Sequence, residues 1–234
     1  MLARRSWQTW TVIDRRERLA SARLYLICDG RPDAWLHAAL RGGVDIVQLR
    51  DKTVDDVQLV LLGRHFARIC AEHAALFILN DRPDLVADTD ADGVHVGQDD
   101  TPVAAARAIV GAQRLVGLST HSRAQVDAAG PAGVDYIGVG PVHQTPTKPG
   151  AAAVGLELIR HAAAHATTPF FAIGGIDAGK LPTVRAAGAR GVAVVRALTQ
   201  AADPERAARA LRAELEAASP GDESGVGGVS VGAP

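Results

Sequence analysis

The sequence predicts an α/β protein with a single domain folded as a (β/α)8 TIM barrel. Eight short segments rich in Val, Ile and Leu alternate with amphipathic segments rich in Ala and Leu. Nearly continuous apolar runs are typical of parallel strands that helices cover on both faces. An open doubly wound sheet would show the same alternation, but eight β–α units favour closure into a barrel. A length of 234 residues suits one such domain.

The elements follow one another in regular order along the chain. The expected strands span residues 24–28, 45–50, 76–81, 93–97, 114–119, 136–140, 170–175 and 191–198. The expected helices span residues 33–43, 54–74, 102–111, 123–133, 156–166, 180–190 and 204–218. We divide the chain into an N-terminal extension (1–22), the barrel domain (23–218) and a C-terminal tail (219–234). The tail is rich in Gly and Ser, so we expect it to be disordered.

Net charge, apolar runs and cysteine positions indicate which partners and which cellular compartment to expect. A net charge of -1 argues against a nucleic-acid or membrane-surface role, and no apolar run approaches the roughly 18 residues that span a bilayer. The basic N-terminus is not followed by the apolar stretch of an export signal. Cys28 and Cys70 lack metal-ligand spacing and fit buried thiols in a reducing compartment. We therefore expect a cytoplasmic protein with small-molecule ligands and without nucleic-acid or membrane partners; a homo-oligomer remains open.

Polar residues gather where the expected strands end, which is where barrels of this class place their sites. In strand order these are Gln48, Arg50 and Lys52; Asn80 and Asp81; Gln98, Asp99 and Asp100; Ser119 and His121; Thr145, Thr147 and Lys148; Gly174 and Gly175; and Arg196. Cations and hydroxyls suit phosphate oxygens, and two carboxylates beside a phosphate suit Mg²⁺. A glycine pair lets backbone N–H groups approach an anion. The rim is thus predicted to bind phosphate and Mg²⁺.

Each segment also has a purely structural interpretation. The segment 48–52 could be a solvated turn, and the acids at 81, 99 and 100 could be helix caps. His121 is expected to be a hydrogen-bonding support, because no second histidine is placed to join it on a metal. The Pro-containing segment 141–150 could be an ordinary loop. Convergence of all these residues on one rim favours a binding site over the separate structural interpretations.

The motifs "VQLRDK", "LNDR", "DGVHVGQDD", "GLSTHS", "DYIGVGPVHQTPTK" and "AIGGI" occur in this order, each at a strand end. Over residues 24–215 the chain thereby resembles the thiamine-phosphate synthase (thiamine-phosphate pyrophosphorylase) family. The resemblance implies that residues 23–218 form the catalytic domain of a transferase. This enzyme would join 4-amino-5-hydroxymethyl-2-methylpyrimidine diphosphate to hydroxyethylthiazole phosphate, giving thiamine phosphate and pyrophosphate. The implied route is dissociative and Mg²⁺-assisted: the bond to pyrophosphate breaks first, and the thiazole nitrogen captures the resulting cation.

The resemblance also implies a role for each matched residue. Arg50, Lys52, Asn80, Ser119 and Lys148 would hold the diphosphate, with Arg50, Lys52, Ser119 and Lys148 as the catalytic groups. Asp81 and Asp100 would bind Mg²⁺, and Gln48 would lie near the pyrimidine. Thr145, Thr147 and the backbone at Gly175, Val195 and Arg196 would hold the thiazole phosphate. A small serine often stands in the family where this chain has Arg196.

Two alternative functions fit the same barrel. One is the related thiazole tautomerase, an isomerase that binds only the thiazole. The other is a phosphate-binding barrel without catalysis. Asp100, Thr147 and Lys148 favour the synthase over the tautomerase, and the pair of metal-binding acids favours it over the non-catalytic barrel.

Overall fold

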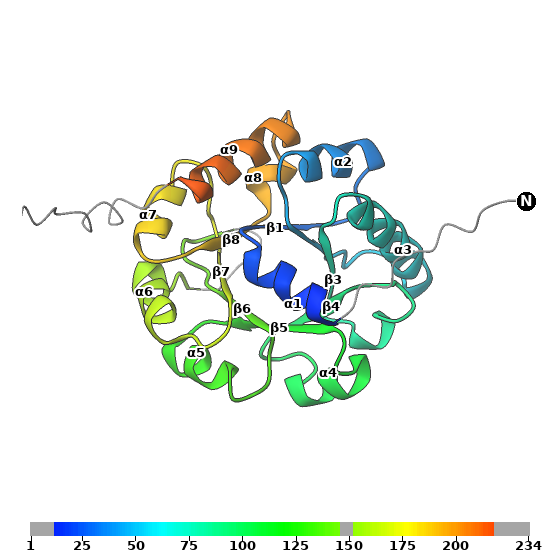
Figure 1. Cartoon of the computed structure of the whole chain (residues 1–234), viewed down its shortest axis with the longest axis horizontal. Helices are drawn as coiled ribbons and strands as arrows, with labels where there is room; N and C mark the ends of the chain where they lie inside the picture. The colour runs from blue at the N-terminus through cyan, green and yellow to red at the C-terminus, as the bar shows by residue number, and fades with distance from the viewer. Residues whose placement is uncertain (1–11, 146–151, 218–234) are drawn as a thin grey trace, which may run out of the picture.

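A computed structural model of the chain shows eight parallel strands closed into a barrel, in the order β1 to β8 (Figure 1). The structure describes residues 12–145 and 152–217. The strands are β1 (Leu24–Cys28), β2 (Ile46–Leu49), β3 (Leu76–Asn80), β4 (Gly93–Val96), β5 (Leu115–Thr120), β6 (Tyr136–Val139), β7 (Phe170–Ile173) and β8 (Gly191–Val194). The helices are α1 (Val12–Ser21), α2 (Asp33–Arg41), α3 (Asp56–Glu72), α4 (Val103–Val110), α5 (Arg123–Ala129), α6 (Gly155–His165), α7 (Leu181–Ala186), α8 (Arg196–Thr199) and α9 (Pro204–Glu216). The predicted (β/α)8 barrel is confirmed.

Alternation along the strands separates two apolar clusters. Leu24 and Leu26 of β1 belong to the large cluster that packs the strands against the helices. Tyr25 and Ile27 of the same strand belong to a second cluster, with Phe171 from β7, which only β8 separates from β1. Successive strand residues point to opposite faces, so the second cluster fills the barrel interior. This parity decides which side chains can reach the carboxyl end of the barrel from inside.

The N-terminal extension contains a helix that lies across one end of the barrel. Figure 1 looks along the barrel and shows α1 crossing its opening. Arg15 of α1 donates to Asp92, the residue before β4, over 2.8 Å, and Arg16 donates to Asp135, the residue before β6, over 2.9 Å. Leu19 is buried among the interior residues. The helix therefore closes the amino end of the barrel, opposite the predicted site.

The third β–α unit differs from the regular pattern. The connection from β3 to β4 holds only a short 3₁₀ helix, η1 (Pro83–Leu85), among the described residues. The twelve residues 81–92 contain five Asp and a Pro, which are poor helix formers. The segment packs tightly on α3, since a Cβ at Gly63 would lie 2.5 Å from the Thr89 side chain. The segment 81–92 therefore covers its side of the barrel by packing closely on α3, without a full helix of its own.

The prediction for the last strand was wrong at its end. We expected a strand over 191–198, but β8 stops at Val194 and Arg196 begins the short helix α8. Val195, with φ -115° and ψ -84°, turns the chain out of the extended conformation. Arg196 therefore stands at the start of a helix on the rim instead of within the sheet.

Two further expectations concern the C-terminal tail and membrane-spanning helices. The C-terminal tail, 219–234, lies outside them, and its predicted disorder stays a prediction. Within residues 12–145 and 152–217, none of the helices has the length and apolar character needed to cross a membrane.

Candidate active site

A cavity of about 410 Å³ opens at the carboxyl end of the barrel. Its walls come from residues at or just beyond the ends of the strands. The predicted site residues that line it are Gln48, Arg50, Lys52, Asn80, Asp81, Asp100, Ser119, Thr145, Gly175, Val195 and Arg196. Thr147 and Lys148 lie outside the described residues. The strand-end rule thus brings residues far apart in the sequence to one cavity.

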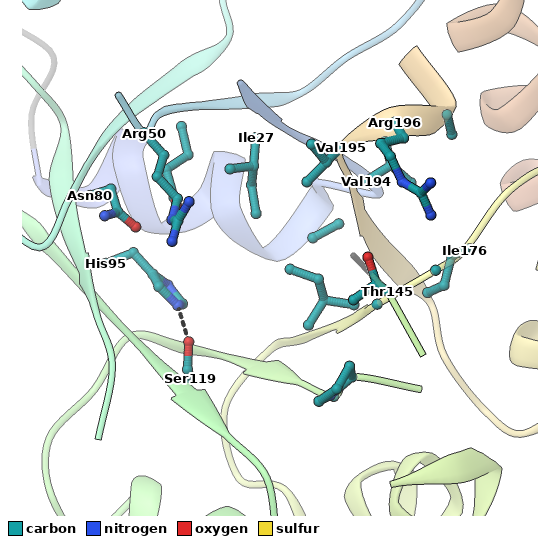
Figure 2. Close-up of a pocket in the computed structure, with 18 of the residues that line it drawn as sticks. Ile27, Arg50, Asn80, His95, Ser119, Thr145, Ile176, Val194, Val195 and Arg196 are labelled. Carbon is teal, nitrogen blue, oxygen red and sulfur yellow. Dashed lines mark hydrogen bonds between the residues drawn. The ribbon is translucent and has the colours of Figure 1, made fainter. Parts of the chain in front are cut away.

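The cavity has two polar ends separated by apolar side chains. Figure 2 shows Arg50, Asn80 and Ser119 gathered on one side, and Arg196 with Thr145 on the other. Ile27 of β1 lies between the two groups. A ligand that fills this cavity would meet hydrogen-bonding groups at both ends and an apolar wall in its middle.

The two acids meet at the first end. The carboxyl groups of Asp81 and Asp100 contact each other, and Lys52 Nζ lies 4.0 Å from Asp81 Oδ2. Burial, then the neighbouring Asp100 carboxylate, raises the pKa of Asp81 above its ordinary value. Asp81 also has a φ of 59°, in the left-handed region that a non-glycine residue rarely adopts. The protein holds two carboxyl groups together, one of them on a residue with a strained backbone conformation, as cation-binding sites do.

Helix capping does not explain these acids. The residue at the N-cap of α4 is Pro102, which makes no side-chain capping bond, and that at the N-cap of η1 is Arg82, which makes none either. Asp100 instead accepts a hydrogen bond of 2.8 Å from the backbone N–H of Gly97, which orients its carboxylate within its own loop. The interpretation of Asp81 and Asp100 as helix caps is therefore excluded.

The donor set suits a magnesium ion bound partly by its substrate. Within residues 12–145 and 152–217, no cluster of three or more His, Cys, Asp or Glu side chains is arranged to hold a metal. Mg²⁺ commonly takes one or two carboxylates and completes its shell with water and phosphate oxygens. The contacting pair Asp81 and Asp100, beside cations that would hold a phosphate, fits that pattern.

Strand-end reasoning missed His95, which lies in the middle of the site. His95 Nε2 lies 2.9 Å from Ser119 Oγ, the bond drawn in Figure 2, and its Nδ1 lies 3.2 Å from the hydroxyl of Tyr136. It escaped the strand-end rule because it is the third of the four residues of β4 and precedes the end of the strand. A lone polar residue in the apolar segment "GVHVG", at an inward position, was the available signal.

His121 has the supporting role that the sequence predicts. Its Nδ1 lies 2.5 Å from the carbonyl oxygen of Gly140, and its backbone N–H donates to Gln125 over 2.7 Å. The first bond ties the end of β5 to the loop that follows β6, and the second ties it to α5.

The second end is built mainly from backbone. Gly174 and Gly175 have φ values of 105° and 63°, and a Cβ on Gly174 would lie 2.5 Å from Pro141. Only glycine fits at Gly174, and the absence of a side chain lets an anion approach the backbone N–H groups closely. The exposed side chain of Arg196 points into the same part of the cavity as Thr145 (Figure 2). Among the residues that the structure describes, no carboxylate lies within ion-pairing distance of Arg196.

The profile of the family described as thiamine monophosphate synthase matches residues 24–198, which is most of the barrel. The chain belongs to this family.

Individual members of the family are similar over nearly the whole barrel. The thiamine-phosphate synthase of Streptomyces avermitilis is 51% identical over 207 residues, covering 86% of this chain and 96% of the relative. That of Nostoc punctiforme is 47% identical over 208 residues, and the match covers 88% of this chain but only 59% of that longer protein. A solved structure, the thiamine phosphate pyrophosphorylase of Pyrococcus furiosus, is 32% identical with a TM-score of 0.78. It is covered to 97%, and this chain to 86%.

The family match spans every strand and ends within the short helix that Arg196 begins. Residues 24–198 include the two acids, the basic residues that follow β2 and the glycine pair after β7. Membership in the thiamine monophosphate synthase family therefore rests on the same segments that form the cavity, not on the two chain ends.

Proposed function

We propose that this member of the family is a thiamine-phosphate synthase. It would condense 4-amino-5-hydroxymethyl-2-methylpyrimidine diphosphate with hydroxyethylthiazole phosphate, giving thiamine phosphate and pyrophosphate. One observation supports this most strongly: a single cavity has a contacting pair of acids beside basic residues at one end and a separate glycine-and-arginine cradle at the other. Two substrates that each carry phosphate call for two such ends.

The first end would hold the diphosphate. Arg50, Lys52, Asn80 and Ser119 line it with the donors that diphosphate oxygens accept. Lys148 would join them; its place lies outside the described residues. Asp81 and Asp100 would hold Mg²⁺, whose chemistry is to neutralise the charge that grows on the departing pyrophosphate. The reaction needs this charge stabilisation because the pyrophosphate leaves with both electrons of the C–O bond.

The remaining chemistry needs no protein nucleophile. The aminopyrimidine ring donates electrons to its own methylene cation, and the thiazole nitrogen lone pair then forms the C–N bond. The protein's part is to hold the two rings together away from water, with the apolar side chains of Ile27, Ile173 and Ala193 in the cavity wall. Gln48, buried at 2% exposure at the bottom of the cavity, would meet the pyrimidine.

The second end would hold the thiazole phosphate. Thr145 and the backbone at Gly175, Val195 and Arg196 line it, and Thr147 would belong to the same loop. The unpaired guanidinium of Arg196, judged over the described part of the chain, adds a charge to this end. Its contribution would be to affinity for the phosphate and not to the bond-breaking step.

The test is product formation by the purified chain. Both substrates with Mg²⁺ are expected to yield thiamine phosphate, identified by its mass, and omission of either substrate or chelation of Mg²⁺ should prevent it. Asp81→Asn is the matched control, because it keeps the side-chain volume and removes the charge. Absence of product from the folded wild-type chain would overturn the proposal. We further propose a cytoplasmic location, which the free, buried thiols of Cys28 and Cys70 support.

A further inference from the structure

A series of five hydrogen-bonded side chains crosses the barrel interior and joins two residues of the cavity wall, Gln48 and Ser119. Gln48 Nε2 donates to the Tyr25 hydroxyl over 2.6 Å, and this hydroxyl lies 2.9 Å from that of Tyr136. The Tyr136 hydroxyl lies 3.2 Å from His95 Nδ1, and His95 Nε2 lies 2.9 Å from Ser119 Oγ. Gln48, His95 and Ser119 line the cavity, and the two tyrosines do not. This series of hydrogen bonds therefore leaves the cavity at Gln48 and returns to it at Ser119.

The sequence makes room for this chain at one glycine. Gly117 of β5 is the register partner of both His95 on β4 and Tyr136 on β6. A Cβ at Gly117 would lie 2.2 Å from the Tyr136 ring and 2.6 Å from His95 Nδ1. Any other residue at this position would push these two side chains apart. Edge-to-face packing of Tyr25 on Tyr136 and Phe171 fixes the remaining ring positions.

The series of hydrogen bonds runs in one donor-to-acceptor direction, because each hydroxyl has one proton to donate. Burial raises the pKa of Tyr25 and of Tyr136 well above the ordinary value, so both stay protonated. Since Gln48 donates to Tyr25, the Tyr25 proton is directed to Tyr136 and the Tyr136 proton to His95 Nδ1. A neutral imidazole that accepts at Nδ1 donates from Nε2, here to Ser119.

This direction sets what each end offers to a ligand. Ser119 accepts from His95, so its own O–H is directed to the cavity as a donor, which suits an anion. Gln48 uses its N–H on Tyr25, so its Oε1 is left as an acceptor, which suits an amino group. Reversal would require every bond in the chain to reverse. It would then offer a lone pair at Ser119 and a donor at Gln48, which suits neither.

We propose that Gln48, Tyr25, Tyr136, His95 and Ser119 form a one-directional hydrogen-bond relay that couples binding of an anion at Ser119 to binding of an amino group at Gln48. Tyr25, Tyr136 and His95 are positioning residues in this relay. The inference rests on the proposed function for the identity of the ligands, a diphosphate and an aminopyrimidine. Each ligand would lock the direction that the other requires, so each would bind more tightly when the other is present.

The experiment measures that coupling without turnover. The probes are inorganic pyrophosphate with Mg²⁺ and the alcohol 4-amino-5-hydroxymethyl-2-methylpyrimidine, titrated calorimetrically one after the other. We expect the wild-type protein to bind the alcohol about tenfold more tightly when saturated with pyrophosphate, within the usual range of such couplings. The 4-oxo analogue, which offers no amino group, should show no such gain.

Variants separate the relay from simple packing. Tyr25→Phe and Tyr136→Phe keep the rings and remove one link each, and the affinity ratio is expected to fall to about one in both. The matched control is Thr120→Val, which removes a buried hydroxyl on β5 that takes no part in the relay. This hydroxyl donates to the Gly138 carbonyl over 3.1 Å. It should keep the wild-type ratio. Melting temperatures show that each variant is folded.

Two results would overturn the relay: no coupling in the wild-type protein, or full coupling in both Phe variants. Failure of the proposed function looks different. In that case the wild-type protein makes no thiamine phosphate whether or not the two probes bind cooperatively. A protein that turns over normally without coupling would keep the function and lose the relay.

Discussion

The carboxyl groups of Asp81 and Asp100 contact each other at the carboxyl end of the barrel, one following β3 and the other following β4. The loop conformations that hold them include a left-handed residue at Asp81 and a close approach at Gly97, where a Cβ would lie 2.6 Å from Asp100 Oδ2. Like charges held this way disfavour the folded state until a cation or a proton joins them. This relationship connects the stability of the chain to the chemistry we propose.

Asp100→Asn is expected to stabilise the metal-free protein. The pKa of Asp81 is raised in the folded state, so ionisation of this residue disfavours folding. The loss of stability grows as the pH rises from the ordinary pKa of Asp to the raised pKa of Asp81. Removing the Asp100 charge lessens that loss, and Asn can still accept from the Gly97 N–H. Urea denaturation from about pH 3, below the ordinary pKa of Asp, to about pH 7 should show a stability advantage of the variant that appears only as pH rises.

The same substitution should weaken metal dependence and turnover together. We expect Mg²⁺ to raise the melting temperature of the wild-type protein but not of Asp100→Asn, and kcat/KM to fall by about 100-fold or more. Because the two acids would serve one ion, adding Asp81→Asn should cost little further activity. Fully additive losses in the double variant would mean that the acids act separately.

Arg196→Ser tests the thiazole-phosphate end. A guanidinium hydrogen bond to a phosphate contributes roughly 1.5–3 kcal/mol, so the KM for the thiazole phosphate should rise by about tenfold or more. Saturated turnover and the KM for the pyrimidine diphosphate should stay near their wild-type values. A variant that loses thermal stability with both KM values unchanged would instead assign Arg196 a structural role.

Asp92→Ala tests the amino end of the barrel, where α1 packs. Asp92 is 8% exposed and accepts from the Phe77 N–H over 2.9 Å and from Arg15 over 2.8 Å. Its loss leaves a buried backbone donor without its acceptor and should cost about 2–4 kcal/mol of unfolding free energy. KM values should not change, since the site is at the other end. Urea denaturation and steady-state kinetics on one sample separate these effects.

Sequence reasoning reached the fold and most of the cavity for a physical reason. Parallel strands end at one rim, so residues such as Arg50, Asp81 and Ser119 converge whatever lies between them. It failed where local propensity misleads. Val195 is β-branched yet turns the chain into α8.

Interior side chains were the larger gap. His95, Tyr25 and Tyr136 were counted as parts of apolar strands, because a strand segment alone does not show which polar atoms meet across a barrel. Only the register, with Gly117 between His95 and Tyr136, brings them together. Thr147 and Lys148 lie outside the described residues, so their predicted roles stay predictions.

The most direct measurement follows pyrophosphate release and thiazole phosphate isomerisation in the same reaction with Mg²⁺. Our account predicts one pyrophosphate for each thiamine phosphate formed, release only when both substrates are present, and no isomerisation. Isomerisation of the thiazole phosphate without pyrophosphate release would indicate the tautomerase and contradict the account. Tight binding of both substrates with neither reaction, in the intact protein with Mg²⁺, would contradict it in favour of a non-catalytic barrel.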